Sequence, residues 1–235
     1  MVQIKDLQKT YGDFTLYIND LHIPKGESFG LVGNNGAGKT TLFNLILDLI
    51  RPDKGKVYIN GIPVNESEEW KKYTSAFLDE SFLIPYLTPE EYFEFLAKLR
   101  HVPKEDMEKI LERFKNFFGG EILGKKKLIR DLSKGNQKKT GIAGAFIGMA
   151  PLIVLDEPFA NLDPSSQIKL KRLLNDFRKD DITFLISSHN LEHITDVTDR
   201  IVILDEGKVK KDLQVNRDTL QELIQFFEEQ ITNEI

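Results

Sequence analysis

The stretch that decides the fold reads Gly33-Asn34-Asn35-Gly36-Ala37-Gly38-Lys39-Thr40-Thr41. It follows the apolar run of residues 29–32 and precedes residues 42–50, which have a helix-like composition. A strand, a glycine-rich turn with the spacing G-x-x-x-x-G-K-T and a helix, in this order, are typical of a phosphate-binding loop (P-loop). Glycines let successive backbone N–H groups face an anion, and the helix N-terminus adds partial positive charge. The stretch therefore predicts a nucleotide site, and a flexible turn is the less favoured alternative.

Two side chains of the loop have a defined task in phosphate binding. Lys39 is placed to reach the β- and γ-phosphates, and the Thr40 hydroxyl is placed to ligand Mg²⁺. The other residues of the stretch would surround the phosphates through their backbone. We therefore predict that the whole stretch from Gly33 to Thr41 contacts the nucleotide and that Lys39 also takes part in catalysis.

The composition is that of an ordinary soluble globular chain. Its 235 residues are 40% hydrophobic and 29% charged, enough for one large domain or two small ones. The absence of cysteine excludes a disulfide framework and a thiolate metal site, and it fits a cytosolic setting. No signal-peptide pattern and no bilayer-spanning apolar run is visible in the sequence. The net charge of −5 argues against a general nucleic-acid binder, so we expect no nucleic-acid partner.

Apolar patterning predicts strands on both sides of the P-loop. Residues 2–11 and 14–18 suit a hairpin around Gly12-Asp13, because apolar and polar residues alternate in its second strand. Residues 152–155 are continuously apolar, as in a strand buried on both faces. Further strands are expected at residues 27–32, 56–59, 73–78, 182–186, 201–204 and 208–213.

Helix signals dominate the middle of the chain. Thr88, Pro89 and the acids Glu90 and Glu91 make an N-cap, a proline at the first helical position and negative charge at the positive end of the helix. Helices are expected at residues 89–100, 104–118, 133–149 and 164–179. A C-terminal helix carries an apolar face, whose role is core packing or a dimer contact, formed by Leu220, Leu223, Ile224, Phe227 and Ile231.

These elements predict an α/β fold of the P-loop NTPase type. A mostly parallel sheet flanked by helices is joined by an N-terminal antiparallel β subdomain and interrupted by a helical insertion. We expect one domain, residues 1–235. Its ATP-binding α/β core comprises residues 1–78 and 140–235, and its helical subdomain comprises residues 79–139.

Polar residues follow three of the buried strands. The P-loop follows the first, Asp156 and Glu157 the second, and Ser187-Ser188-His189 the third. In an open parallel sheet, ligands bind at these carboxyl ends. Asp156 suits Mg²⁺, which prefers oxygen ligands. Glu157 is placed to polarise an attacking water and His189 to contact the γ-phosphate. Each residue alone has an ordinary structural alternative, but together with the P-loop they indicate catalysis.

A further motif carries a family resemblance. Leu132-Ser133-Lys134-Gly135-Asn136-Gln137 resembles the signature motif of ABC-type ATPases, which also have the P-loop and a strand-end Asp-Glu-Pro. The resemblance covers essentially the whole chain. Residues 152–158 are similar to the family's Walker B motif, and residues 160–163, ending in Asp163, are similar to its D-loop.

The resemblance implies roles for further residues. Tyr11 corresponds to the aromatic residue that stacks on adenine, and His189 to the switch histidine. Ser133 and Gly135 correspond to residues that bind the γ-phosphate across a dimer, and Asp163 of the D-loop is implied to be a further nucleotide-binding residue. ATP with Mg²⁺ is the implied ligand. A head-to-tail dimer, presumed to be a homodimer, would hold two ATP molecules between its subunits.

Two positions depart from the family pattern. Asp79 stands where the family has glutamine; we expect it to serve Mg²⁺, and the alternative is that it caps the following turn. Lys134 replaces a glycine in the first turn of the signature helix. A cation is unfavourable there, which hints at an anionic neighbour, while a solvated lysine is an equal alternative.

The resemblance implies the ATP-hydrolysing subunit of a membrane transporter. Separate transmembrane permease subunits would dock on the helical insertion and hold the protein at the cytoplasmic face of the cell membrane, and export is the favoured direction. A soluble ABC ATPase that acts on ribosomes or DNA is the rival, disfavoured by a single P-loop and a short insertion. A cassette that binds ATP without turnover is disfavoured by Glu157 and His189.

Overall fold

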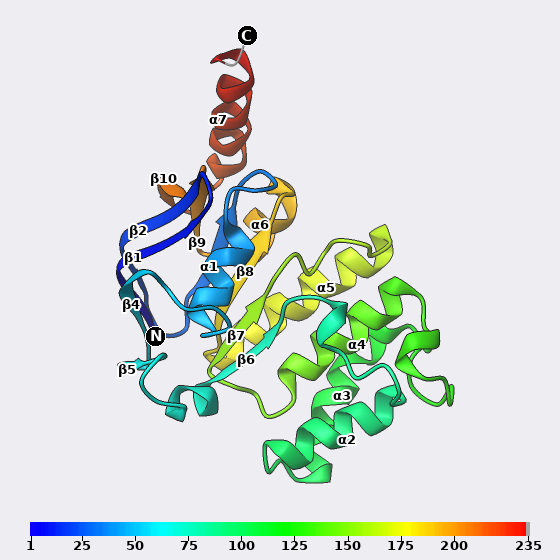
Figure 1. The fold of residues 1–235 in the computed structure, drawn as a ribbon. Helices are drawn as coiled ribbons and strands as arrows, with labels where there is room; N and C mark the ends of the chain where they lie inside the picture. Colours follow the sequence, from blue (N-terminus) through cyan, green and yellow to red (C-terminus); the bar gives the residue numbers. More distant parts are fainter. Residues whose placement is uncertain (234–235) are drawn as a thin grey trace.

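A ten-stranded sheet runs through residues 1–233, the part of the chain that the computed structural model describes (Figure 1). The strand order is β5-β4-β1-β2-β10-β9-β3-β8-β7-β6. The strands are β1 (Val2–Tyr11), β2 (Phe14–Ile23), β3 (Ser28–Val32), β4 (Lys54–Ile59), β5 (Ile62–Pro63), β6 (Thr74–Phe77), β7 (Leu152–Leu155), β8 (Thr183–Ser188), β9 (Arg200–Asp205) and β10 (Lys208–Gln214). The last two residues of the expected domain, 234–235, lie outside this description.

The sheet has a parallel part and an antiparallel part. Strands β9, β3, β8, β7 and β6 are neighbours and run parallel. Strand β1 pairs antiparallel with β2 and β4, and β10 joins the two parts by pairing antiparallel with β9 and parallel with β2. The expected α/β class with an N-terminal antiparallel part is therefore confirmed.

Alternate residues of the parallel strands face two separate hydrophobic cores. In β7, Ile153 and Leu155 pack into one core, and Leu152 and Val154 into the other. Strands β8 and β9 divide in the same way. Burial on both faces explains why these strands are continuously apolar rather than alternating.

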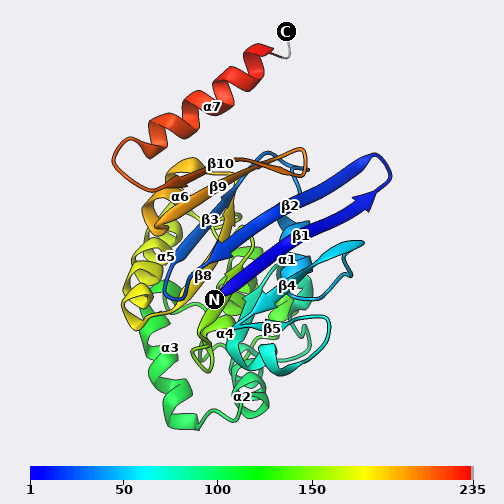
Figure 2. The same cartoon turned by 90° about the vertical axis from the view of Figure 1, so that its left-hand side faces the viewer.

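Seven helices surround the sheet in the described residues. They are α1 (Lys39–Ile46), α2 (Pro89–Leu99), α3 (Lys104–Phe118), α4 (Lys134–Phe146), α5 (Pro164–Phe177), α6 (Leu191–Val197) and α7 (Thr219–Asn233). Short 3₁₀ turns are η1 (Glu69–Tyr73), η2 (Glu80–Phe82), η3 (Ile129–Asp131) and η4 (Arg178–Asp180). Helices α2, α3 and α4 gather at the end of the molecule opposite the hairpin of β1 and β2 (Figures 1 and 2).

Several elements differ from their expected bounds, α1 and β2 most of all. Helix α1 begins at Lys39, inside the P-loop motif, and ends at Ile46 rather than near residue 50. Strand β2 extends to Ile23 although Asn19 and Asp20 have low strand propensity, because β2 pairs with β1 along its whole length. For β2, pairing with β1 therefore outweighs the low strand propensity of its residues.

Phenylalanine rings connect the helical segment to the core. Phe146 of α4 lies 5.2 Å from Phe114 of α3, 4.4 Å from Phe177 of α5 and 5.9 Å from Phe184 of β8, measured between ring centroids. Helix α4 also continues across the expected boundary at residues 139–140. The division into core and helical subdomain stays a prediction.

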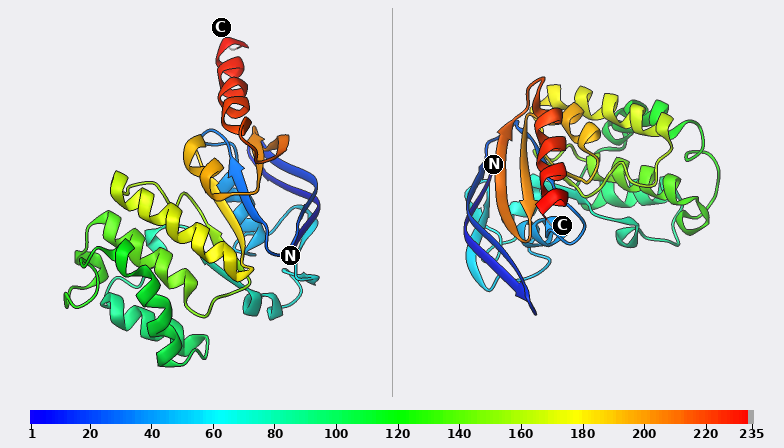
Figure 3. Two further views of the ribbon diagram at one scale, coloured as in Figure 1. Left: turned by 180° about the vertical axis from the view of Figure 1, so that it is seen from behind. Right: turned by 90° about the horizontal axis from the view of Figure 1, so that it is seen from above.

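Helix α7 extends from the body beyond β9 and β10 (Figure 3). Its Leu223 is fully buried, and Gln230 Nε2 donates to Asp205 Oδ2 at 2.9 Å. At least part of the expected apolar face therefore packs on the core; the side chain of Ile231 lies outside those described. Across residues 1–233, no helix has the length and apolar character needed to cross a membrane.

Candidate active site

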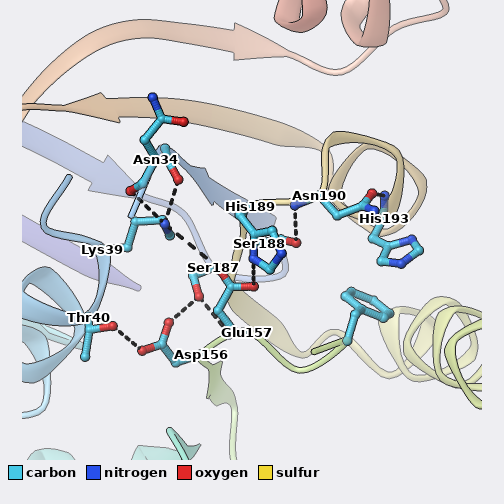
Figure 4. Close-up of polar contacts among 12 residues, drawn as sticks. Asn34, Lys39, Thr40, Asp156, Glu157, Ser187, Ser188, His189, Asn190 and His193 are labelled. Carbon is cyan, nitrogen blue, oxygen red and sulfur yellow. Dashed lines mark hydrogen bonds and ion pairs between the residues drawn. The ribbon is translucent and has the colours of Figure 1, made fainter. Parts of the chain in front are cut away.

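The P-loop, the strand-end acids and His189 meet because their strands are neighbours (Figure 4). The P-loop follows β3, His189 follows β8, and Asp156 and Glu157 follow β7. Val32 pairs with Ser188, and Leu155 pairs with Ile186, so the strands end at one edge. These residues are far apart in sequence but lie around one loop.

Glycine is required in the P-loop for two reasons. A Cβ atom on Gly33 would lie 2.1 Å from the Leu204 carbonyl oxygen, so no larger residue fits. Gly36 and Gly38 have φ of +84° and +105°, where L-residues are strained. Gly38 precedes α1 without a side-chain cap, and the first helical turn carries no acid. The helix N-terminus is therefore open to an anion.

Lys39 is buried at the centre of the loop. Its Nζ donates to the carbonyl oxygens of Gly33 at 2.6 Å and Asn34 at 3.2 Å, and lies 3.9 Å from Glu157 Oε1. Burial lowers the pKa of the Lys39 ammonium, opposed by the charges of Glu157 and Asp156. The cation is held close to the space where a phosphate would enter.

Thr40 and Asp156 place two hard oxygen ligands together. Thr40 Oγ1 donates to Asp156 Oδ2 at 2.7 Å, and the Ser187 hydroxyl donates to Asp156 Oδ1. Burial raises the pKa of Asp156, opposed by these two hydrogen bonds. A buried carboxylate beside a hydroxyl fits Mg²⁺ that takes its other ligands from phosphate and water. Residues 1–233 contain no cluster of three His, Asp or Glu side chains suited to a metal.

Glu157 and His189 form a second pair. His189 Nδ1 lies 2.9 Å from Glu157 Oε2, and the Glu157 N–H donates to Ser187 Oγ at 2.8 Å. The Glu157 backbone has φ of +47°, in the left-handed region that residues other than glycine rarely adopt. Strained backbone of this kind clusters at functional sites, where surrounding contacts hold it.

Two cavities lie beside the P-loop. One, of about 280 Å³, is lined by Phe14, Glu157 and the loop residues Asn35, Gly36, Gly38, Lys39, Thr40 and Thr41. The other, of about 640 Å³, is lined by Phe14, Asp13, Thr15, Asp205, Glu206, Lys208 and the loop residues Asn34, Asn35, Gly36 and Ala37. Phe14 belongs to the hairpin of β1 and β2. Tyr11 lies opposite Phe14 at the tip of this hairpin, and its side chain is half exposed.

The signature-like segment begins α4 as expected. Ser133 is the N-cap and accepts a hydrogen bond from the Asn136 N–H at 3.2 Å. A Cβ atom on Gly135 would lie 3.2 Å from the Asn161 carbonyl oxygen, so the segment lies against the D-loop of its own chain. Ser133 and Lys134 are both exposed. The helix N-terminus therefore faces outward.

Asp163 and Asp79 both cap helical turns. Asp163 begins α5 and accepts from the Ser166 hydroxyl at 2.6 Å, the Ser165 hydroxyl at 2.7 Å and the Ser166 N–H at 3.0 Å, which lower its pKa. Asp79 begins η2 and accepts from the Ser81 N–H at 2.6 Å. No hydrogen bond or ion pair within residues 1–233 joins Asp79 to Thr40 or Asp156.

Three residues beside the site had no role assigned from the sequence, although Ser187 was expected at the end of its strand. Ser187 joins Asp156 to the Glu157 backbone, and Phe14 lines both cavities. Lys138 of α4 is buried and donates to the Glu157 carbonyl. The polar residues that end the segment 182–188 are a sequence signal that points to Ser187. Nothing in the pattern of α4 distinguishes Lys138 from a surface lysine.

Known proteins are similar to this chain. The family model described as ABC transporter matches residues 18–160. The uncharacterized ABC transporter ATP-binding protein YhaQ of Bacillus subtilis strain 168 is 34% identical over 88% of this chain and 69% of that protein. The SkfA peptide export ATP-binding protein SkfE of the same strain is 33% identical over 92% of this chain and 90% of that protein. The chain belongs to the ABC transporter family of ATP-binding proteins.

A solved structure supports the same assignment. The ATP-binding cassette MJ0796, in a dimeric post-hydrolysis state bound to ADP and Pi, matches with a TM-score of 0.80 and 28% identity over 92% of this chain and 99% of that one. Both the expected fold and the ABC ATPase class are thereby confirmed. Relatives are named for export and for import, so family membership leaves the direction open.

Proposed function

We propose that this chain is the ATP-hydrolysing subunit of an ABC transporter and works as a dimer around two MgATP. The observation that carries the proposal is the meeting of the Thr40–Asp156 pair and the Glu157–His189 pair around one P-loop. The first pair is suited to hold a metal beside phosphates, and the second to orient a water. Phosphoryl transfer needs little else from a protein than such positioning and charge stabilisation.

The residues of the loop bind and orient the triphosphate. Backbone N–H groups from Gly36 to Thr41 and the N-terminus of α1 face the phosphates, and Lys39 moves from its carbonyl contacts to the β- and γ-phosphates. Thr40 and Asp156 would hold Mg²⁺, which would neutralise phosphate charge. Tyr11 stacks on the adenine in this proposal; its ring is exposed, and it pairs across the hairpin with Phe14, which lines both cavities.

Glu157 is the proposed general base. Its carboxylate orients a water and accepts the proton as the water attacks the γ-phosphorus. His189 holds Glu157 Oε2 through Nδ1, and its side chain is exposed, so that in this proposal its ring also meets the γ-phosphate. The leaving group is ADP, and Lys39 stabilises the negative charge that develops on the transferred oxygens.

A second copy of the chain completes each site. Ser133 and Gly135 lie at the outward-facing start of α4, whose first turn, in the described part of the chain, carries no acidic residue and so gives the helix N-terminus no anion of its own. The partner's γ-phosphate supplies one in a head-to-tail dimer, and the dimeric state of the MJ0796 cassette supports this arrangement. In the proposed dimer of this chain, the exposed Lys134 also faces the partner's phosphates. Asp163 holds the D-loop at the same interface.

Separate membrane subunits are proposed to dock on the helical segment. Several large apolar side chains of that segment are exposed: Phe82, Tyr86, Phe95 and Leu99. We propose that a protein partner covers these side chains, because burial in an interface removes their apolar area from water. The protein would then lie at the cytoplasmic face of the membrane. Export is the proposed direction, supported by the name of SkfE, a relative matched over nearly its whole length.

Asp79 is proposed to serve Mg²⁺ through a bound water while it caps η2. The two tasks are compatible, because a carboxylate has two oxygens and the cap uses Oδ1. Asp79→Ala should raise the Mg²⁺ concentration needed for half-maximal ATP turnover. An unchanged Mg²⁺ dependence and turnover rate would exclude the metal role and leave only the cap.

Single-turnover hydrolysis by Glu157→Gln tests the proposed chemistry. The variant keeps the shape of the side chain but removes the base, so we expect ATP to bind while turnover falls by at least about 100-fold. Glu222→Gln, an exposed glutamate on helix α7, is a charge-matched control. Hydrolysis by Glu157→Gln at the wild-type rate would contradict the assigned base.

The rival function is that of a soluble ABC ATPase acting on ribosomes or DNA. The exposed apolar residues of the helical segment favour a transporter, since a nucleic-acid surface would be basic. Copurification from detergent-solubilised membranes distinguishes the two. Recovery of an integral membrane protein supports the transporter, whereas recovery of ribosomes or DNA supports the rival.

A further inference from the structure

Lys138 is a buried cation that contacts the backbone of the proposed catalytic base. It lies on α4, and its Nζ donates to the Glu157 carbonyl oxygen at 3.0 Å. The same carbonyl accepts the Ala160 N–H at 3.2 Å, which closes the turn after the strand. Lysine is rarely buried without a partner, so this position calls for a specific explanation.

The charge of Lys138 is balanced by Glu80. Lys138 Nζ lies 3.6 Å from Glu80 Oε1, and both side chains are largely buried. In the described part of the chain, Glu80 Oε1 is buried and has no hydrogen-bond partner. Each charge of the pair therefore depends on the other. The pair joins the signature helix to η2, the turn that follows Asp79.

The backbone of Glu157 needs to be held from several sides. Its φ of +47° is unfavourable for a side chain with a Cβ atom, and such a conformation persists only where neighbours fix it. Ser187 accepts from its N–H on one side, and Lys138 donates to its carbonyl on the other. The direction of the Glu157 carboxylate follows from this backbone conformation.

We propose that Lys138 is a positioning residue for ATP hydrolysis, which holds Glu157 in place from the signature helix with Glu80 as its counter-ion. The inference rests on the proposed function, in which Glu157 is the base. It has a structural consequence: Ser133 and Lys138 lie on one rigid helix, about 7.5 Å apart along its axis. The helix that meets the partner's ATP therefore also fixes the base of its own chain.

A double-mutant cycle in the full-length protein tests the proposal. We expect Lys138→Met to lower kcat by roughly 10- to 100-fold, the effect of a small misplacement of a catalytic group, with KM for ATP almost unchanged. Added to Glu157→Gln, the same change should have no further effect, because the residue it positions is already lost. Lys139→Met, an equally buried neighbour that contacts Phe117 instead, is the matched control and should keep wild-type turnover.

A second variant separates positioning from folding. Lys138→Met leaves Glu80 buried without its counter-ion, which alone can destabilise the protein. Lys138→Met with Glu80→Leu removes both charges, so its melting temperature should return toward that of the wild type while turnover stays low. Turnover that recovers together with the melting temperature would overturn the proposal.

The outcomes also distinguish this inference from the function on which it rests. If Glu157→Gln hydrolyses ATP at the wild-type rate, the assigned base is wrong. If Glu157→Gln is inactive but Lys138→Met keeps wild-type kcat, or lowers turnover further in the Glu157→Gln background, only the role of Lys138 is wrong.

Discussion

The Nδ1 atom of His189 lies 2.9 Å from Oε2 of Glu157, although 32 positions separate the two residues in the chain. Their strands, β8 and β7, are parallel neighbours, so both side chains leave the sheet at the same edge. The second carboxylate oxygen of Glu157, Oε1, is 3.9 Å from Lys39 Nζ. The proposed base is therefore held between a histidine and the P-loop lysine.

Removing the imidazole should impair hydrolysis more than binding. We expect His189→Ala to lower turnover by roughly 100-fold, because Glu157 loses the group that orients it, and to leave ATP affinity nearly unchanged. Steady-state ATPase and equilibrium ATP binding are the measurements. His22→Ala, an exposed histidine on β2, is the control. Equal turnover in both variants would remove His189 from the mechanism.

Asp156→Asn should make the nucleotide-free protein more stable and inactive. Burial raises the pKa of Asp156, so the folded protein binds its proton more tightly than the unfolded chain does. Stability then falls as the pH rises from the unfolded pKa through the folded one, and the ionised carboxylate is destabilising at pH 7. Asparagine removes that charge and the Mg²⁺ ligand together. A melting temperature at pH 7 below that of the wild type would contradict this account.

Tyr11 should contribute to ATP affinity through its ring. Tyr11→Ala is expected to weaken ATP binding by about tenfold, the usual loss when a base loses an aromatic stacking partner. Tyr11→Trp should retain the affinity. Fluorescent-nucleotide titration measures both. Phe14→Ala is an informative comparison, since Phe14 lines both cavities; a loss of affinity confined to Phe14→Ala would move the stacking role to that residue.

The cap formed by Asp163 should be visible as a pH dependence of stability. Hydrogen bonds from Ser166 and Ser165 lower the pKa of Asp163, so its contribution is complete above the unfolded pKa of about 4 and is lost as the pH falls below it. The wild type should exceed Asp163→Ala in free energy of unfolding at pH 7, by a margin that shrinks in acid. Urea titrations between pH 7 and pH 2.5 measure this margin. A constant margin would show that the charge is irrelevant.

Local sequence patterns predicted the elements that carry the site. The strand at residues 152–155 and the helix at residues 104–118 agree with the structure residue for residue. Their signals are local, namely a short apolar run and a helix between Pro103 and Gly119. The N-cap at Thr88 is confirmed for the same reason.

Relationships between distant residues could not be predicted in this way. Ser187 acquires its role only because β8 lies between β3 and β7, an order that no local pattern encodes. Lys138 and Lys139 stand side by side in the sequence like surface residues, yet both are buried beneath neighbouring elements. The sequence predicted the strand-end residues but not the contacts that hold them.

A site shared between two copies of the chain is the central proposal, and mixing two inactive variants tests it directly. Lys39→Ala lacks the P-loop cation, and Ser133→Arg blocks the signature segment. A head-to-tail heterodimer of the two contains one intact site, so random mixing should restore about a quarter of wild-type ATPase activity. If the mixture is no more active than the sum of the separate variants, the signature segment does not act on the partner's ATP and the shared site is contradicted.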